Sequence, residues 1–283
     1  MNAIEIQNLS KNYADFSLAN INLALPMGTI MGLVGENGAG KSTIIKLIMN
    51  AIAADSGSIS VLGVSNQSKE FVALKQDIGI VLDEGYFPEV LSAEDLNKIM
   101  NKTYINWSKD IYFGYLKKFK LPHDKKIKDY SRGMKMKLAI AVALSHNPKL
   151  LILDEATGGL DPMVRDEILN VFNDFTREEN NSILISSHII SDLEKICDYI
   201  TVLHKGNLVF CEEKDVLLNK YALVNLSKED FESLPTNAIV SKKNTSYGYQ
   251  TLIMKDKINE AFTSEKTTLE DIILFMTKEP GIE

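Results

Sequence analysis

The chain has 283 residues, 45% hydrophobic and 24% charged, which is enough for one large domain or two smaller ones with a buried core. Its 16 glycines and 7 prolines are an ordinary share, so collagen-like and disordered chains are excluded. A net charge of −7 lacks the positive field on which non-specific nucleic-acid binding relies. We therefore expect no nucleic acid as a partner.

The two cysteines, Cys197 and Cys211, offer neither a disulfide framework nor a four-ligand zinc site, which fits a reducing cytosol. The N-terminal stretch has no signal-peptide hydrophobic region. The longest apolar run has seven residues, 138–144, whereas a membrane span needs roughly 18 to 20. Any membrane role would require a separate partner.

In chain order, the first half predicts three strands, a glycine loop, a helix, a fourth strand and two further helices. Turn residues at Asp55-Ser56-Gly57 close the first helix. The predicted strands are 3–8, 16–25, 30–34 and 78–82, and the predicted helices are 44–52, 92–120 and 131–145. We interpret residues 88–147 as a helical insertion.

The second half alternates strands with helices, which predicts a mostly parallel sheet covered on both faces. The predicted strands are 150–153, 182–186, 200–203 and 208–211, and the predicted helices are 162–179 and 189–197. Gly206-Asn207 is typical of a hairpin turn. From residue 213 the pattern changes to alternating short segments. We expect a small C-terminal unit over 213–283 with a final amphipathic stretch at 268–278.

The strongest motif in the sequence is Gly35-Glu36-Asn37-Gly38-Ala39-Gly40-Lys41-Ser42-Thr43, which lies between a predicted strand and a predicted helix. It matches the P-loop pattern, in which backbone N–H groups surround a β-phosphate at a helix N-terminus. Lys41 would reach the β- and γ-oxygens and Ser42 would bind Mg²⁺. We expect ATP and Mg²⁺ here, with Asn37, Gly38, Ala39, Gly40, Lys41, Ser42 and Thr43 as the binding residues.

Four apolar residues at 150–153 are followed directly by Asp154 and Glu155, which is typical of a Walker B strand. Asp154 would hold Mg²⁺ through water. The adjacent Glu155 would polarise the attacking water as a general base. Ordinary strand-end acids are the alternative, but the P-loop favours the functional interpretation.

His188 follows the predicted strand 182–186, so it should lie at the carboxyl end of the sheet, where open α/β folds bind ligands. We predict a contact between His188 and the γ-phosphate, with a surface histidine as the alternative.

Together these residues resemble the ATP-binding subunit of an ABC transporter, over roughly residues 1–212. The discriminating feature is Tyr130-Ser131-Arg132-Gly133-Met134, which precedes the Walker B strand by one helix. Ser131 and Gly133 match the family's signature motif, whereas Tyr130, Arg132 and Met134 depart from it. The resemblance implies that Ser131 and Gly133 reach the ATP of a second subunit in a head-to-tail dimer.

The same resemblance implies an α/β fold: a RecA-like P-loop ATPase core with an antiparallel β subdomain, a helical insertion and a small C-terminal α+β tail. Gly158-Gly159-Leu160-Asp161 is similar to the family's D-loop, which would bring Asp161 to the dimer interface. Tyr13 matches the aromatic residue that stacks on adenine, with a core tyrosine or Phe16 as alternatives.

Where the family usually has the Q-loop glutamine, this chain has Asp83, followed by Glu84 and Gly85. An aspartate can still bind Mg²⁺, but it adds negative charge beside phosphates. The loop should also lie near the groove where a membrane subunit docks, for which Phe87, Trp107 and Tyr112 are anchor candidates unless they are buried helical core.

Residues 117–137 contain nine Lys or Arg against two Asp, which indicates either a solvated helical face or proximity to an anionic surface. In all, the sequence predicts an ATP-hydrolysing subunit, a homodimer or heterodimer, on the inner face of the cell membrane. With partner membrane subunits it would export a drug, antibiotic or amphipathic peptide, similar to bacitracin or phenol-soluble modulin exporters.

Two other classes remain as alternatives. A soluble ABC ATPase acting on ribosomes or nucleic acid usually has two cores or a long coiled coil, whereas this chain has one P-loop and no sustained heptads. A regulator that binds ATP with weak hydrolysis is suggested by the altered Q-loop. A GTPase is disfavoured because there is no Asn-Lys-x-Asp motif.

Overall fold

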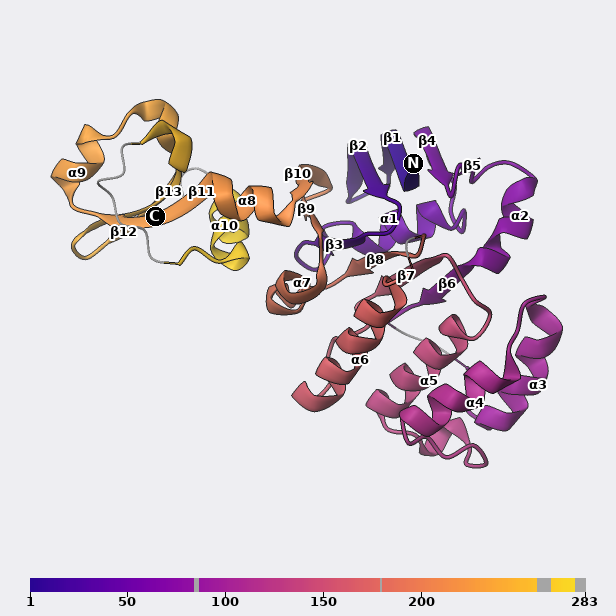
Figure 1. The fold of residues 1–283 in the computed structure, drawn as a ribbon. Coiled ribbons are helices and arrows are strands. Elements are labelled where there is room, and N and C mark those ends of the chain that lie inside the picture. The colour runs from indigo at the N-terminus through magenta and orange to yellow at the C-terminus, as the bar shows by residue number, and fades with distance from the viewer. Residues whose placement is uncertain (84–86, 179, 259–265, 278–283) are drawn as a thin grey trace.

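The computed structural model describes residues 1–83, 87–178, 180–258 and 266–277. Their strands form a six-stranded sheet, a four-stranded sheet and a three-stranded sheet (Figure 1). The first two lie within residues 2–213 and the third lies in the C-terminal unit. No helix in the described ranges combines the length and the apolar character needed to cross a membrane.

The six-stranded sheet is the centre of the larger unit and has the order β10-β9-β3-β8-β7-β6. All neighbouring pairs are parallel except β9 with β10. The strands are Ile30–Val34 (β3), Ile78–Val81 (β6), Leu150–Asp154 (β7), Ser182–Ser186 (β8), Tyr199–His204 (β9) and Asn207–Glu213 (β10). Every residue of β3, β7 and β8 is buried, as continuous apolar runs predict for a sheet covered on both faces. Their carboxyl ends therefore meet at one edge.

The four-stranded sheet is antiparallel, with the order β2-β1-β4-β5. Its strands are Asn2–Asn12 (β1), Ser17–Pro26 (β2), Ser56–Val61 (β4) and Val64–Ser65 (β5). Its inner side chains share one core with β3 and with the helix after the glycine loop. The sequence did not predict β4, because its serines and Gly57 are typical of a turn and the strand is stabilised by pairing with β1.

The central sheet is covered by Lys41–Ile48 (α1), Pro162–Phe175 (α6) and Ile190–Ile196 (α7), whereas Glu70–Leu74 (α2) lies against β5 of the other sheet. The predicted end of α1 at residue 52 was wrong, since the chain turns after Ile48 and Asn50 has a φ of 51°. The predicted helix 162–179 was too long, since α6 ends at Phe175 and residues 176–178 are not helical, while residue 179 lies outside the described residues.

The helical insertion contains Ala93–Thr103 (α3), Lys109–Lys118 (α4) and Arg132–Leu144 (α5). The prediction of one helix over 92–120 was wrong, because the chain breaks after α3. The Ser108 hydroxyl accepts a hydrogen bond from the Ile111 N–H at 3.3 Å and so begins a new helix.

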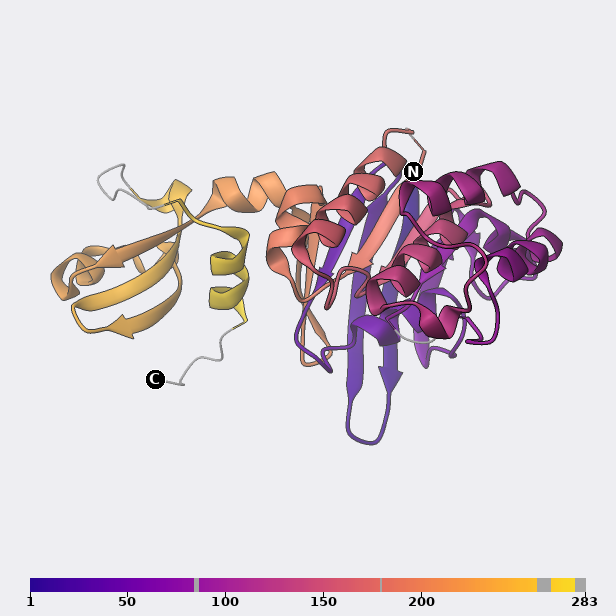
Figure 2. The same ribbon diagram turned by 90° about the horizontal axis from the view of Figure 1, so that it is seen from below.

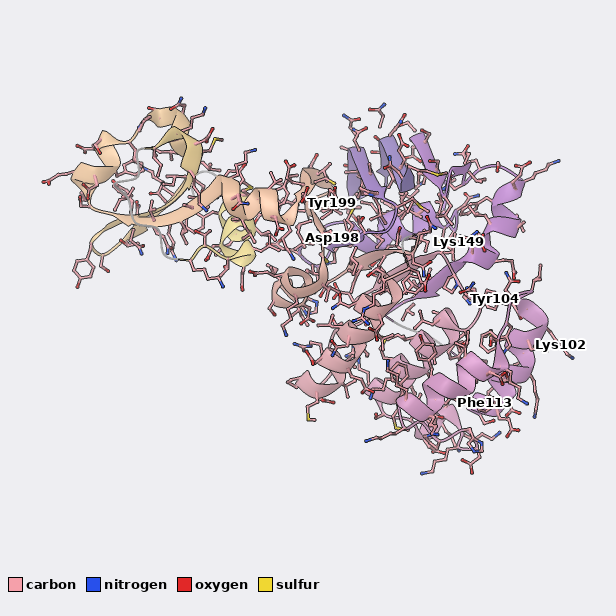
Figure 3. The ribbon with its side chains drawn as sticks, viewed as in Figure 1. Lys102, Tyr104, Phe113, Lys149, Asp198 and Tyr199 are labelled. Carbon is pink, nitrogen blue, oxygen red and sulfur yellow. The ribbon has the colours of Figure 1, made fainter. Side chains whose placement is uncertain are left out.

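Trp107 and Tyr112 are buried, so the interpretation of these two rings as docking anchors was wrong and the helical-core alternative holds. The Trp107 indole donates to Asn97 Oδ1 at 3.0 Å, and the Tyr112 hydroxyl donates to the Ala93 carbonyl at 2.9 Å. Both rings instead join α3 to α4. Phe87 is half-buried against the same core. Figure 3 labels Tyr104 in the connection between these helices.

In its described residues, 214–258 and 266–277, the C-terminal unit contains a three-stranded antiparallel sheet of order β11-β13-β12 and three α-helices. These elements are Lys214–Lys220 (α8), Tyr221–Leu226 (β11), Lys228–Ser233 (α9), Ile239–Thr245 (β12), Gly248–Met254 (β13) and Leu269–Met276 (α10). Helix α10 lies between this sheet and α7, as Figures 1 and 2 show. Its buried side chains, including Ile272 and Phe275, join the main hydrophobic core. The domain boundary at 212/213 stays a prediction.

Candidate active site

The glycine loop joins the end of β3 to the start of α1, and its shape depends on the absence of side chains. A Cβ atom at Gly35 would lie 2.6 Å from the Leu203 carbonyl oxygen. Gly40 has a φ of 111°, and a Cβ there would lie 2.6 Å from Leu18 Cδ2. Glycine is therefore required at both positions for the backbone to curl at the N-terminus of α1.

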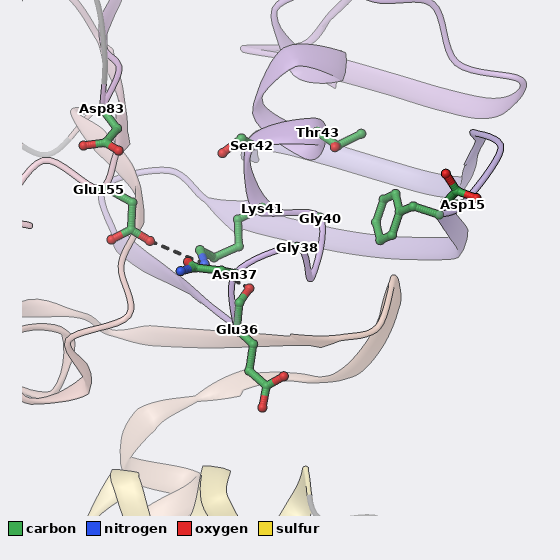
Figure 4. Close-up of a pocket in the computed structure, with 11 residues that line it drawn as sticks. Asp15, Glu36, Asn37, Gly38, Gly40, Lys41, Ser42, Thr43, Asp83 and Glu155 are labelled. Atoms are coloured by element: carbon green, nitrogen blue, oxygen red, sulfur yellow. Dashed lines mark hydrogen bonds and ion pairs between the residues drawn. The ribbon is translucent and has the colours of Figure 1, made fainter.

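A cavity of about 520 Å³ opens over this loop (Figure 4). Six of the seven predicted loop residues line it, whereas Ala39 is buried beneath the surface. The lining residues are Asp15, Phe16, Glu36, Asn37, Gly38, Gly40, Lys41, Ser42, Thr43, Asp83 and Glu155. The free N–H groups and positive dipole of the α1 N-terminus favour an anion at this end of the cavity.

Lys41 provides the positive charge at the centre of the site. Its Nζ donates to the Gly35 carbonyl at 2.7 Å and lies 3.4 Å from Glu155 Oε1. The side chain is only 6% exposed. A buried ammonium needs a counter-charge, and Glu155 supplies it.

Glu155 lies just beyond the end of β7 in a backbone conformation that non-glycine residues rarely adopt, with a φ of 52°. Its N–H donates to Ser186 Oγ at 3.1 Å, and its Oε2 lies 2.7 Å from His188 Nδ1. Neighbouring structure thus holds this carboxylate between Lys41 and His188. Such strain clusters at functional sites.

Asp154 is the last residue of β7 and is 7% exposed. Its Oδ1 accepts a hydrogen bond from Ser186 Oγ at 2.5 Å. Ser186, at the end of neighbouring β8, therefore contacts both acids, and the sequence analysis assigned it no role. Its place just before Ser187-His188, at the edge where strand ends meet, was the available signal.

The described ranges hold no cluster of three or more His, Cys, Asp or Glu side chains able to hold a metal ion. Mg²⁺ prefers a few protein oxygens together with substrate phosphates and waters. A hydroxyl at Ser42 and a nearly buried carboxylate at Asp154 are hard oxygen donors of this kind. The residues present fit a Mg²⁺ ion that enters with a triphosphate.

Asp83 lines the cavity on the same side as Glu155 (Figure 4). Its Oδ1 also accepts a hydrogen bond from Arg132 Nη2 at 3.2 Å, which the sequence analysis did not predict. A metal contact for Asp83 stays a prediction, while Glu84 and Gly85 lie outside the described residues.

Phe16 lines the cavity, whereas Tyr13 does not and is 48% exposed. The two rings lie near one another, with centroids 6.4 Å apart. The stacking of Tyr13 on adenine stays a prediction.

Ser131, Gly133 and Asp161 also lie outside the cavity lining in the part of the chain that the structure describes. Ser131 begins α5 by accepting a hydrogen bond from the Met134 N–H at 3.3 Å, and Asp161 begins α6 in the same way at 3.0 Å. Burial raises the pKa of Tyr130, whose hydroxyl donates to the Pro122 carbonyl, so the residue before Ser131 remains neutral.

Arg165 on α6 is a further contact that the sequence did not indicate. Its Nη2 donates to the Leu160 carbonyl at 3.2 Å, and its Nε lies 3.6 Å from Asp192 Oδ2 on α7. Asp192 is buried, so this arginine joins the segment before Asp161 to the helix after His188.

Comparison with known proteins places the chain among transport ATPases. A family model described as ABC transporter matches residues 18–158. The lantibiotic transport ATP-binding protein SrtF of Streptococcus pyogenes is 35% identical over 243 residues, 85% of this chain and 99% of that protein. The bacitracin transport ATP-binding protein BcrA of Enterococcus faecalis is 37% identical over 210 residues, 73% of this chain and 68% of that protein.

Among solved structures, the ATP-binding subunit of an ABC transporter matches with a TM-score of 0.69 and 27% identity, over 76% of this chain and 91% of that chain. Fold and cavity thus define a RecA-like P-loop ATPase. The chain belongs to the ABC transporter family as an ATP-binding subunit. The resemblance and the fold class predicted from the sequence are confirmed.

Proposed function

We propose that this subunit hydrolyses ATP to drive export of a drug, antibiotic or amphipathic peptide through partner membrane subunits. The relatives are named as lantibiotic and bacitracin transport proteins, which supports a peptide-like antibiotic as cargo. The alternatives of a ribosome-acting ATPase and a non-hydrolysing regulator gain no support from these names. The observation that carries the proposal is that Lys41 and Glu155 line one cavity and that Glu155 contacts both Lys41 and His188.

In the proposed reaction, the triphosphate binds to the loop N–H groups. The Lys41 ammonium leaves Glu155 and contacts the β- and γ-phosphates. Glu155 is then free to accept a proton from a water molecule, whose oxygen attacks the γ-phosphorus as ADP leaves. His188 orients the Glu155 carboxylate and contacts the γ-phosphate. Mg²⁺, when bound, would be held by Ser42 and Asp154 and would neutralise phosphate charge.

A second ATPase subunit, identical or related, would complete the site. The support is that Ser131 and Gly133 lie outside the lining of the chain's own cavity as described here, although the family signature acts on nucleotide. We propose that they cover the nucleotide of the partner, that Asp161 lies at the shared interface, and that Tyr13 stacks on the base. Tighter Mg-ATP binding by the closed dimer than by the open one would then drive transport.

We further place the subunit on the inner face of the cell membrane, bound to membrane subunits and not to nucleic acid. The support is the family of transport ATPases together with the net charge of −7. Co-purification with a multi-span membrane protein, and not with ribosomes, is the expected result.

The test of hydrolysis is Glu155→Gln, which keeps the side-chain shape but removes the base. Phosphate release should fall by a factor on the order of 100 or more, and Mg-ATP should trap a dimer in size-exclusion chromatography. The matched control is Glu70→Gln on α2, an exposed acid outside the cavity lining, which should match the parent. Equal phosphate release by Glu155→Gln and parent would discard Glu155 as the base.

A further inference from the structure

The two charged residues at which this chain departs from its family's motifs lie in contact with one another. Asp83 stands at the position of the Q-loop glutamine, and Arg132 stands inside the signature motif, 49 residues later. Their side chains form an ion pair, with Arg132 Nη2 3.2 Å from Asp83 Oδ1. Neither departure is explained alone. Together they place a negative and a positive side chain in contact across two subdomains.

Arg132 occupies an unfavourable place for a cation, because it is the first residue of α5 and the helix dipole favours negative charge there. The first turn of α5 contains no acidic residue of its own. Asp83 supplies that negative charge from the end of β6. The ion pair therefore links the start of α5 to the segment that follows β6.

The same guanidinium also lies against the segment that leads to Asp161. A Cβ atom at Gly159 would lie 2.6 Å from Arg132 Nη1, so a side chain there would require the guanidinium to shift. A Cβ atom at neighbouring Gly133 would lie 3.8 Å from Leu160, an ordinary contact. One side chain thus contacts both the Asp83 position and the Gly159 segment while it flanks Ser131.

We propose that Asp83 and Arg132 are positioning residues that set the orientation of the Ser131–Gly133 segment for the nucleotide of the partner subunit. The inference rests on the proposed function, in which that segment completes the second ATP site. Small misplacements of a positioning group lower the rate of a reaction strongly. The pair therefore acts on the closed dimer and not on nucleotide binding by the single chain.

The solvent exposure of Arg132 and Asp83 distinguishes a positioning role in catalysis from a role in folding. The Arg132 and Asp83 side chains are 58% and 43% exposed, and exposed ion pairs contribute little to stability. Variants at these positions should therefore fold with a melting temperature close to that of the parent. A matched control is Arg177→Gln, which breaks an exposed pair with Asp174 of the same 3.2 Å length, both residues lying outside the cavity lining.

The test compares Arg132→Gln, Asp83→Asn, their double variant and Arg132→Lys in the full chain. Each single neutral variant should lower kcat about tenfold, and the double variant should be no worse, because both remove the same interaction. Affinity of the single Arg132→Gln chain for a fluorescent ATP analogue should change less than twofold, because Arg132 lies outside the cavity lining. Arg132→Lys should recover at least half of the parent kcat, and Arg177→Gln should match the parent.

Additive losses in the double variant, or a parent-like kcat in Arg132→Gln, would overturn the proposal. So would a higher Mg²⁺ requirement in Asp83→Asn that Arg132→Gln does not share, because Asp83 would then act as a metal contact. Glu155→Gln in the otherwise unchanged chain separates the two ideas. If it traps no dimer and still hydrolyses ATP, the proposed function fails, whereas a trapped dimer that Arg132→Gln leaves unweakened removes only the positioning role.

Discussion

The ammonium group of Lys41 lies 3.4 Å from Glu155 Oε1 while it donates to the Gly35 carbonyl at 2.7 Å. The residue that should bind phosphate is therefore neutralised by the residue that should act as base. In the proposed reaction, an incoming triphosphate competes with Glu155 for Lys41, and this exchange frees the carboxylate. Binding and activation are thereby linked through one contact.

A first prediction follows from this competition. Glu155→Gln removes the negative charge that holds Lys41 and repels phosphate, so the single chain should bind ATP about three- to tenfold more tightly. Titration of a fluorescent ATP analogue at low protein concentration measures the change. Glu36→Gln is the matched control, since Glu36 lines the cavity but its carboxylate points away from Lys41 in Figure 4. A weaker affinity in Glu155→Gln than in Glu36→Gln would contradict the competition.

Ser186 permits a second prediction because it contacts both acids at the end of β7. Ser186→Ala leaves Asp154 without a buried donor, which should cost about 1–3 kcal/mol of unfolding free energy and also lower kcat. Ser182→Ala is the control at the other end of β8, where the equally buried hydroxyl accepts from the Gly28 N–H at 2.9 Å. It should lose stability but retain kcat. The prediction fails if both variants lower kcat to the same extent.

A third prediction concerns two glycines whose replacement by alanine should change the stability of the chain in opposite directions. Gly35→Ala places a methyl group 2.6 Å from the Leu203 carbonyl, so it should destabilise the chain by about 1–3 kcal/mol and weaken ATP binding. Gly114→Ala lies inside α4 with open space around its Cβ, so it should stabilise the chain by about 0.5–1 kcal/mol. Chemical denaturation measures both. Equal effects of the two substitutions would show that the loop tolerates a side chain.

A fourth prediction concerns acid sensitivity at His146. The ring is buried and stacks on the Tyr104 ring, with the two centroids 3.9 Å apart. Its Nε2 atom lies 3.2 Å from the Ile78 carbonyl oxygen. Burial lowers the pKa of His146 below its ordinary value of 6.5. The unfolded chain therefore binds a proton more readily than the folded one, so this residue's contribution is present above pH 6.5 and is lost as the pH falls below it.

Urea denaturation between pH 5 and pH 8 measures this effect. His146→Phe keeps a ring in the stack but removes the titrating group, so the stability advantage of the parent over this variant should shrink on acidification. His123→Gln, at an exposed position, should follow the parent at every pH. A constant difference between parent and His146→Phe would show that the buried ring does not titrate in this range.

Local patterns predicted the strands of the central sheet well. The spans 30–34 and 182–186 were predicted as observed, because each is a short apolar run that is buried on both faces whatever its neighbours are. Strand β4 was not predicted, since its serines form a strand only when β1 pairs with them. Trp107 looked like a surface anchor because a sequence does not show which face of a short connection packs inward.

The sequence by itself determined the phosphate loop, the two acids at the end of β7 and the family, because these depend on residue types at fixed spacing along one segment. Only the tertiary structure decided that Lys41 pairs with Glu155, that Ser186 contacts both acids and that Asp83 meets Arg132. These contacts join residues 31 to 114 positions apart. Their partners are fixed by the order of strands in the sheet and by where the helical insertion packs, which no local pattern encodes.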